Sequence, residues 1–444
     1  MITFWLLLST IIIVFSTYYH IKKTGFQIWD PFLIFICFFL LYPILGETYR
    51  VKADVFSNDV YIFSSFLVCV ASTGILFGVL ISNRIGVKYI KNKSFEYNES
   101  LLKYMAYSVV VVGYIFMWLY YDRFGGIIEF VTSGDRVVRN ELARSTFGNY
   151  PYVNIILAGA MLTILPGIVH AKRTKSANFT LIIVKPLLTV LPLLMFHLID
   201  FDRSNLIKYL LIFITLYGAV FGIRKNYKLI SIMIIMFFLF AVIGAIRGPI
   251  NLYFNGQPVL AKNYFNNVVS RLPGSVLPNE FAAVQSSLHY IVDKNYPLEY
   301  GETFTQSFEY LVPRSFLPYK KRPTLGDRIG NDWGKELFGT KRSFSVGISP
   351  IAEAYLNFGS FGVYFYFMLL AYFFSRLRNK IMEHHIPTFG FYLISVFIAL
   401  AIFRSAFASI FSYLFYLYIF IYFPVLAVKL ITFLMNKKKV NNEY

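Results

Sequence analysis

Apolar stretches alternate with short polar ones along almost the whole chain. Most are long enough to cross roughly 30 Å of hydrocarbon as a helix. They lie near residues 2–19, 31–46, 60–82, 101–121, 152–170, 180–198, 205–222, 229–246, 350–375, 388–403 and 408–433. The pattern predicts an all-α polytopic integral membrane protein with about eleven transmembrane helices.

The composition agrees with this class. Of 444 residues, 57% are hydrophobic, 19% are aromatic and only 15% are charged, and the mean hydropathy is +0.58. Soluble globular proteins contain far more charged residues. Neither cysteine, Cys37 or Cys69, indicates a disulfide or metal site, because both lie inside predicted spans.

The net charge is +19, but the basic residues are concentrated in loops on one side of the membrane. This distribution argues against a nucleic-acid partner. Basic residues recur in alternate loops: Lys22 and Lys23; Arg84, Lys88, Lys91 and Lys93; Lys172, Arg173 and Lys175; Arg224, Lys225 and Lys228; Arg376, Arg378 and Lys380; Lys437, Lys438 and Lys439. Cytoplasmic loops of membrane proteins carry such an excess. We therefore expect these loops to be cytoplasmic, with the N-terminus outside and the C-terminus inside.

This orientation places two long segments, 122–151 and 247–349, on the outer side. We predict a membrane bundle of about eight spans over 1–246, an extracytoplasmic loop subdomain over 247–349, and C-terminal spans over 350–444. Apolar residues at helical spacing in "LPNEFAAVQSSLHYIVDK" predict an amphipathic helix in the long loop. Such a helix lies along the membrane surface or caps the bundle.

The outer segments are also basic, which the positive-inside rule does not explain. The long loop carries twelve Lys and Arg against eight Asp and Glu. Five arginines occur in outer segments that can lie close to the membrane: Arg123, Arg203, Arg247, Arg314 and Arg404. Each arginine can instead snorkel or pair with acids of the loop. Together they favour an anionic ligand such as a lipid pyrophosphate, because guanidinium groups bind phosphate oxygens in a bidentate manner.

One carboxylate, Glu353, occurs where a predicted span begins, in "SVGISPIAEAYLNFGSFGVYFYF" (345–367). Ser349 followed by Pro350 predicts a helix start with a side-chain cap. The helix dipole favours a carboxylate in the first turns. A structural hydrogen-bonding role and a functional role for Glu353 are both open.

Polar residues continue from Glu353 at helical spacing and predict one polar stripe: Glu353, Asn357, Ser360 and Tyr364. A polar stripe in a membrane helix is expected to face the bundle interior or a wet cavity. Gly359 and Gly362 are small enough to let a neighbouring helix come close. On the outer side, His197 and His289 are each a packing residue or a base, and we keep His289 as a substrate-binding candidate.

Two stretches resemble a known family. "YLVPRSFLPYKKRPTLGD" (310–327), followed by "GISPIAEAYLNFGSFGVYF" (347–365), is similar to bacterial oligosaccharide repeat-unit polymerases of the Wzy, or O-antigen polymerase, type. The layout of many spans with a long outer loop before the last ones also fits. The resemblance implies a GT-C-like helical bundle in the bacterial inner membrane. It also implies a growing glycan on undecaprenyl pyrophosphate that is transferred to the non-reducing end of a new lipid-linked repeat.

The resemblance also implies roles for particular residues. Glu353 is the expected base or sugar-positioning group, and Arg314 and Arg203 are expected to be catalytic. Asn357 matches the same motif as Glu353 and is expected to bind substrate. Apart from the resemblance, the outer arginines, the polar stripe and the outer histidines make further substrate-binding candidates of Arg247, Arg404, Arg123, Tyr364 and His289. No metal or nucleotide cofactor is expected, because arginines can neutralise the pyrophosphate. Expected partners are the undecaprenyl-pyrophosphate-linked oligosaccharide and the bilayer, with a chain-length regulator and a flippase.

Two alternative functions remain open. An O-antigen ligase shares the layout but transfers the glycan to a different acceptor. A flippase or transporter is less favoured, because it needs ionisable residues near the bilayer midplane and an internal repeat. The main charge inside a predicted span, Lys185, lies near its cytoplasmic end.

Overall fold

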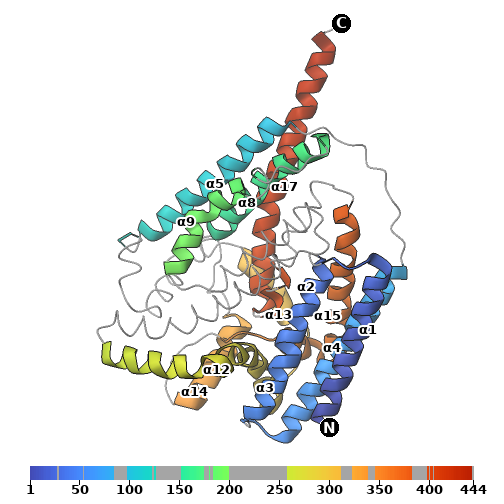
Figure 1. Cartoon of the computed structure of the whole chain (residues 1–444), viewed down its shortest axis with the longest axis vertical. Coiled ribbons are helices and arrows are strands. Elements are labelled where there is room, and N and C mark those ends of the chain that lie inside the picture. Colours follow the sequence, from blue (N-terminus) through green and yellow to red (C-terminus); the bar gives the residue numbers. More distant parts are fainter. Residues whose placement is uncertain are drawn as a thin grey trace. The chain divides into compact units, whose positions relative to one another are not determined.

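The computed structural model describes residues 1–27, 30–53, 55–84, 98–122, 125–126, 152–174, 180, 184–199, 258–311, 323–338, 346–382, 398–399, 401–403 and 405–442. Within these ranges the regular structure is helical, and no strand is present (Figure 1). The predicted all-α class is therefore confirmed for the described part of the chain.

The described helices outside the segment 247–349 coincide with predicted apolar stretches or continue them. In chain order, the described helices are α1 (Ile2–Thr24), α2 (Pro31–Phe39), the π-helical turn η1 (Leu40–Leu45), α3 (Gly46–Ala53), α4 (Asn58–Arg84), α5 (Glu99–Asp122), α8 (Tyr152–Thr174), α9 (Lys185–Ile199), α12 (Pro258–Asp293), α13 (Glu302–Leu311), α14 (Leu325–Phe338), α15 (Pro350–Met382) and α17 (Phe407–Asn442). Three of them, α12, α13 and α14, lie inside the segment 247–349.

Six of the described helices are long and apolar enough to cross a membrane. They cover Ile2–Thr24, Pro31–Arg50, Asn58–Arg84, Ser100–Asp122, Pro350–Leu377 and Phe407–Met435. Shorter apolar helices occupy Ile155–Gly167 and Lys185–Met195. The predicted spans 205–222 and 229–246 and most of 388–403 lie outside the described residues. The total of eleven and the GT-C-like arrangement therefore remain predictions.

The chain divides into two compact units. Unit 1 comprises 1–87, 269–383 and 395–412, and unit 2 comprises 88–268, 384–394 and 413–444. Both units are assembled from segments distant in sequence, whereas the three-part division expected from the sequence is linear. That division stays a prediction.

In unit 1, helix α4 packs along both α1 and α15 (Figure 1). Two glycines of α4, one turn apart, face the backbone of α15. A Cβ atom at Gly74 would collide with the carbonyl oxygen of Tyr364, and one at Gly78 with that of Met368. Absence of a side chain at these positions lets the two helix backbones touch.

Unit 1 also contains a fully buried polar group at the start of α2. His20 Nε2 lies 2.8 Å from Asp30 Oδ2, and Asp30 Oδ1 accepts a hydrogen bond from the Phe32 amide at 2.9 Å. The other ring nitrogen of His20 lies 3.2 Å from Ser375 Oγ on α15. Asp30 thereby caps α2 and joins it to α1.

The predicted amphipathic helix forms the second half of α12. Its apolar residues Val284, Leu288 and Ile291 are buried. The end of this helix holds α14 through exposed polar contacts: Lys294 Nζ lies 2.6 Å from Glu336 Oε1. The Lys294 ammonium keeps the pKa of the Glu336 carboxyl below its ordinary value.

In unit 2, helix α5 packs against α8, and α8 contacts α9. The contact between α5 and α8 again depends on glycine, because a Cβ at Gly113 would lie 2.6 Å from the Ile156 side chain. Tyr114 donates a hydrogen bond to the Thr189 carbonyl oxygen at 2.7 Å, which ties α5 to α9. The predicted site residues in the described chain all lie in unit 1.

Candidate functional site

Helix α15 begins at Pro350, as the sequence predicts. The predicted side-chain cap is wrong, because Ser349 Oγ has no hydrogen-bond partner among the described residues. Instead, the Ser349 backbone amide donates to Ser287 Oγ of α12 at 3.0 Å. The start of α15 is therefore fixed by another helix, and Ser349 does not cap it.

Glu353, in the first turns of α15, is only 3% exposed. Its Oε2 atom accepts a hydrogen bond from the amide of Phe407, the first residue of α17, at 2.7 Å. A carboxylate is favoured there because a helix N-terminus carries unpaired amides and a positive dipole end. The Oε1 atom has no hydrogen-bond partner in the described part of the chain. Oε2 of Glu353 thus makes a structural hydrogen bond to the start of α17, whereas Oε1 makes none within the described residues.

Asn357 lies one turn further along α15 and is fully buried. Its Nδ2 group donates to Thr303 Oγ1 of α13 at 2.6 Å and to the Glu353 carbonyl oxygen at 2.7 Å. Its Oδ1 atom has no hydrogen-bond partner within the described ranges. Thr303 also lies near the Glu353 carboxylate, although no hydrogen bond to Oε1 forms. Glu353 and Asn357 therefore present unsatisfied acceptor atoms on successive turns, beside the hydroxyl of Thr303.

Helix α15 is broken directly after Asn357. Phe358 has φ −142° and ψ 21°, and Gly359 has φ 64° and ψ −159°. The break frees the Leu356 carbonyl oxygen, which accepts a hydrogen bond from the Glu299 amide at 2.8 Å. The predicted continuous stripe through Ser360 is therefore wrong, because the stripe needs one unbroken helix. Gly359 serves the break through its positive φ, and an added Cβ there would contact nothing within 4 Å.

The segment before α13 supports this break. Gly301 has φ +94°, and a Cβ there would lie 3.0 Å from the ring of Phe358. Phe304 stacks on Phe358 with ring centroids 6.2 Å apart. Glu299 is held in turn by Arg328 of α14, whose two terminal nitrogens lie 2.8 and 2.9 Å from its carboxylate oxygens. A charged pair and an aromatic contact thus hold this segment against α15.

Tyr364 lies beyond the break, half-buried, with its ring 5.8 Å from that of Phe77 on α4. Tyr366, which the sequence reasoning missed, interacts electrostatically with the Glu353 carboxylate. Thirteen residues along an unbroken helix would separate these side chains by roughly 140° around its axis. Periodicity alone could not have found Tyr366, because the break changes the direction of the second half of α15.

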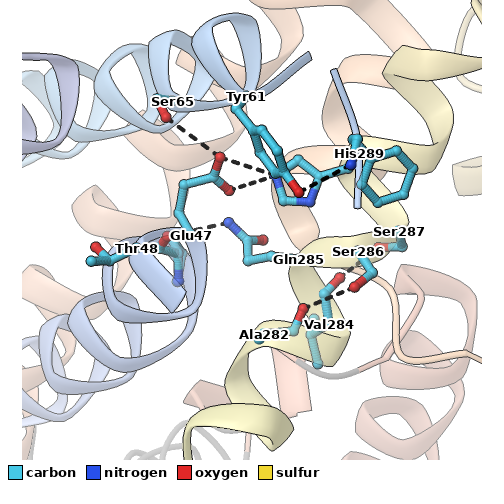
Figure 2. A network of polar contacts seen from close by, with 12 residues as sticks. Glu47, Thr48, Tyr61, Ser65, Ala282, Val284, Gln285, Ser286, Ser287 and His289 are labelled. Carbon is cyan, nitrogen blue, oxygen red and sulfur yellow. Dashed lines mark hydrogen bonds and ion pairs between the residues drawn. The ribbon is translucent and has the colours of Figure 1, made fainter. Parts of the chain in front are cut away.

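His289 of α12 is fully buried, between the rings of Phe56 and Tyr61. Its Nε2 atom lies 2.9 Å from Glu47 Oε2 (Figure 2). Ser65 Oγ makes a longer contact of 3.4 Å to the other oxygen of Glu47. The structure therefore connects His289 to α3 and α4.

The arginines predicted to bind pyrophosphate lie outside the described residues: Arg123, Arg203, Arg247, Arg314 and Arg404. Their convergence stays a prediction. Arg328, which was not among the site candidates, is the arginine that interacts electrostatically with Glu353. Within the described ranges, no group of three or more His, Cys, Asp or Glu side chains is arranged to hold a metal ion.

One protein family matches part of the chain. It is described as O-antigen polysaccharide polymerase Wzy, and the match covers residues 339–439, which include Glu353, Asn357 and Phe407. No curated protein and no solved structure matches the chain. The six long apolar helices are those of a multi-pass membrane protein by length and composition. The match confirms the resemblance found in the sequence and supports membership of the chain in the Wzy family of O-antigen polymerases.

Proposed function

We propose that the protein joins lipid-linked oligosaccharide repeat units at the outer face of the bacterial inner membrane. The growing glycan is transferred from undecaprenyl pyrophosphate to the non-reducing end of a new lipid-linked repeat. The family match supports the polymerase role. The donor and the direction of transfer come from the resemblance of the sequence motifs, and the product is an O-antigen or a capsular polysaccharide.

The arrangement of Glu353 is the observation that carries this proposal. A buried polar atom without a partner is costly and calls for a ligand, a water molecule or a catalytic role. Oε1 of Glu353 and Oδ1 of Asn357 are two such atoms on neighbouring turns. Both are acceptors, and sugar hydroxyl groups are donors. We infer that a hydroxyl of the acceptor sugar binds to Oε1 of Glu353, with Asn357 holding a neighbouring hydroxyl.

The reaction then needs one proton acceptor and one stabilised leaving group. The acceptor hydroxyl oxygen attacks C1 of the donor sugar and forms the new glycosidic bond. The bond between C1 and the pyrophosphate oxygen breaks, and its electron pair leaves with undecaprenyl pyrophosphate. Glu353 takes the hydroxyl proton through Oε1. Because Oε2 is hydrogen-bonded to the Phe407 amide, the carboxylate keeps its orientation throughout.

Stabilisation of the leaving group is assigned to the outer arginines. We propose Arg203 and Arg314 as the catalytic pair, with Arg123, Arg247 and Arg404 in substrate binding. Guanidinium groups stay charged in partly desolvated sites and match pyrophosphate oxygens. Arg328 is bound to Glu299 in a bidentate pair, so we give it a structural role in this function.

The proposal is tested by Glu353→Gln. Glutamine keeps an oxygen that accepts from the Phe407 amide, so the folded protein should persist at normal abundance. The loss of the base should lower polymerisation by about 100-fold or more. The measurement is chain length formed in vitro from a synthetic lipid-linked repeat by purified protein. Glu336→Gln, an exposed carboxylate on α14, is the matched control and should leave chain length normal. Normal chains from Glu353→Gln would reject Glu353 as the base.

A gene deletion separates polymerase from ligase. A cell without the polymerase should carry surface glycan one repeat long, because a single unit can still be attached. A cell without a ligase should carry no attached glycan at all. The second result would reject the polymerase function in favour of the ligase.

A further inference from the structure

The contacts of α12 connect a buried histidine to the start of the helix that carries Glu353. Three polar side chains of α12 make contacts with other segments, and Figure 2 shows Gln285, Ser287 and His289 on this helix. Gln285 Nε2 donates to the Pro43 carbonyl oxygen at 3.3 Å, and His289 Nε2 binds Glu47. Ser287, between them in sequence, accepts from the Ser349 amide at 3.0 Å. Gln285 and His289, four residues apart, therefore hold η1 and α3 from one face of α12, and Ser287, on the opposite face, holds the residue before α15.

Each member of this connection has a fixed orientation. The Ser287 hydroxyl donates to the Val284 carbonyl oxygen at 2.8 Å, so its lone pair is directed to the Ser349 amide. The Ser349 carbonyl oxygen then accepts from the Glu353 amide at 3.1 Å. A displacement of α12 would therefore be transmitted through two hydrogen bonds to Glu353.

The Glu47–His289 pair fixes the position of α12 itself. Both side chains are fully buried. Since a carboxylate only accepts, the Nε2 atom of His289 carries the proton that is donated to Glu47. The two rings beside His289, Phe56 and Tyr61, leave the imidazole little freedom to turn. Glu47 is also bound by Ser65, so the carboxylate is oriented by α4 as well as by α12.

We propose that Glu47 and His289 are positioning residues that hold Glu353 at the distance from the acceptor sugar that the reaction requires. This inference rests on the proposed function of Glu353. His289 acts through α12 and Ser287, not by contact with the substrate. Loss of the pair should lower kcat, the rate at which the enzyme–substrate complex reacts, and leave substrate affinity nearly unchanged. The reason is that a small misplacement of a catalytic group affects mainly the chemical step.

The test compares two substitutions of His289. His289→Gln retains a side-chain N–H that reaches Glu47, whereas His289→Ala does not. We expect His289→Ala to lower kcat for polymerisation by about tenfold or more, with KM changed by less than about twofold. His289→Gln should recover kcat to within about threefold of the original protein. Both values are measured with purified protein and a synthetic lipid-linked repeat, normalised to the folded fraction.

The matched control is the second buried histidine–carboxylate pair in unit 1. His20 is as buried as His289 and binds Asp30 at 2.8 Å, but its polar contact with α15 is to Ser375, beyond the break. His20→Ala should lower thermal stability as His289→Ala does, and kcat per folded molecule should stay unchanged. An equal fall of kcat in both variants would overturn the proposal, because the effect would then be general loosening. A rise of KM alone in His289→Ala would overturn it in favour of direct substrate binding.

The Glu353→Gln background separates this inference from the proposed function. If Glu353 is the residue that the pair positions, adding His289→Ala to Glu353→Gln should lower kcat no further. An inactive Glu353→Gln with a normal His289→Ala would reject the inference alone. An active Glu353→Gln would reject the proposed function.

Discussion

At the scale of single residues, Gly301 is a position outside α15 that contacts the break at Phe358. Its φ of +94° belongs to a region that residues with side chains rarely adopt. The ring of Phe358 occupies the space that a Cβ would need. Two independent constraints therefore require glycine at this position, one from the backbone and one from the neighbouring ring.

We expect Gly301→Ala to destabilise unit 1 by about 1–3 kcal/mol and to displace Phe358. Polymerisation should fall, because Asn357 directly precedes Phe358, and Thr303 directly precedes Phe304, which stacks on the ring of Phe358. Thermal unfolding and product chain length are the two measurements. Gly126→Ala is the control, since Gly126 has φ +110° but no atom of the described residues lies within 4 Å of an added Cβ. Equal effects of the two substitutions would show that the Phe358 contact contributes nothing.

The sequence identified Glu353 and Asn357 because polar residues are conspicuous in an apolar helix. It could not identify Thr303, which reaches Asn357 from a helix more than fifty residues earlier in the chain. Threonine is common in loops and helices alike, so its identity carries no signal. The role of Glu47 was equally hidden, because its partner His289 is 242 residues away.

At the scale of helices, the backbones of α4 and α15 come close at two glycines, beside ring contacts such as that of Phe77 with Tyr364. Gly74 and Gly78 meet the carbonyl groups of Tyr364 and Met368, which lie in the second half of α15. The sequence predicted such a contact for Gly359 and Gly362, and this was wrong. Gly359, with its positive φ, forms part of the break. A Cβ added at Gly362 would meet Ala354 and Phe358, which precede it in α15 itself.

We expect Gly78→Leu to push α15 away from α4 and to destabilise the protein by about 1–3 kcal/mol, as overpacking does. The thermal unfolding midpoint in detergent should fall, and protein abundance should fall with it. Ile81→Phe is the control, because Ile81 belongs to the same helix and is 36% exposed. An unchanged midpoint in Gly78→Leu would contradict the close contact.

Hydropathy predicted the helices well, because each apolar run needs about twenty residues to cross a bilayer. It did not predict where a helix changes its geometry. The π-helical turn around Pro43 and the break at Gly359 both lie inside apolar runs. Both depend on contacts from elsewhere: Gln285 binds the Pro43 carbonyl oxygen, and the Glu299 amide binds that of Leu356.

At the scale of the whole molecule, the charge pattern predicts an orientation in the membrane. Lys23 is expected on the cytoplasmic side and Tyr300 outside; both are exposed. In a protein without Cys37 and Cys69, Tyr300→Cys should react with a membrane-impermeant maleimide in intact spheroplasts. Lys23→Cys should react only after permeabilisation. The reverse pattern would contradict the predicted orientation and the outer location of the proposed reaction.

The hydrogen bond between the Glu299 amide and the Leu356 carbonyl oxygen has a consequence for how such a protein can diversify. It joins two main chains and therefore does not depend on which side chains stand at either position. If the segment 247–349 lies outside the membrane, as the charge pattern predicts, its exposed residues can be replaced to suit a new sugar while this anchor persists. Evolution can then vary specificity in that segment without rebuilding the proposed reaction centre.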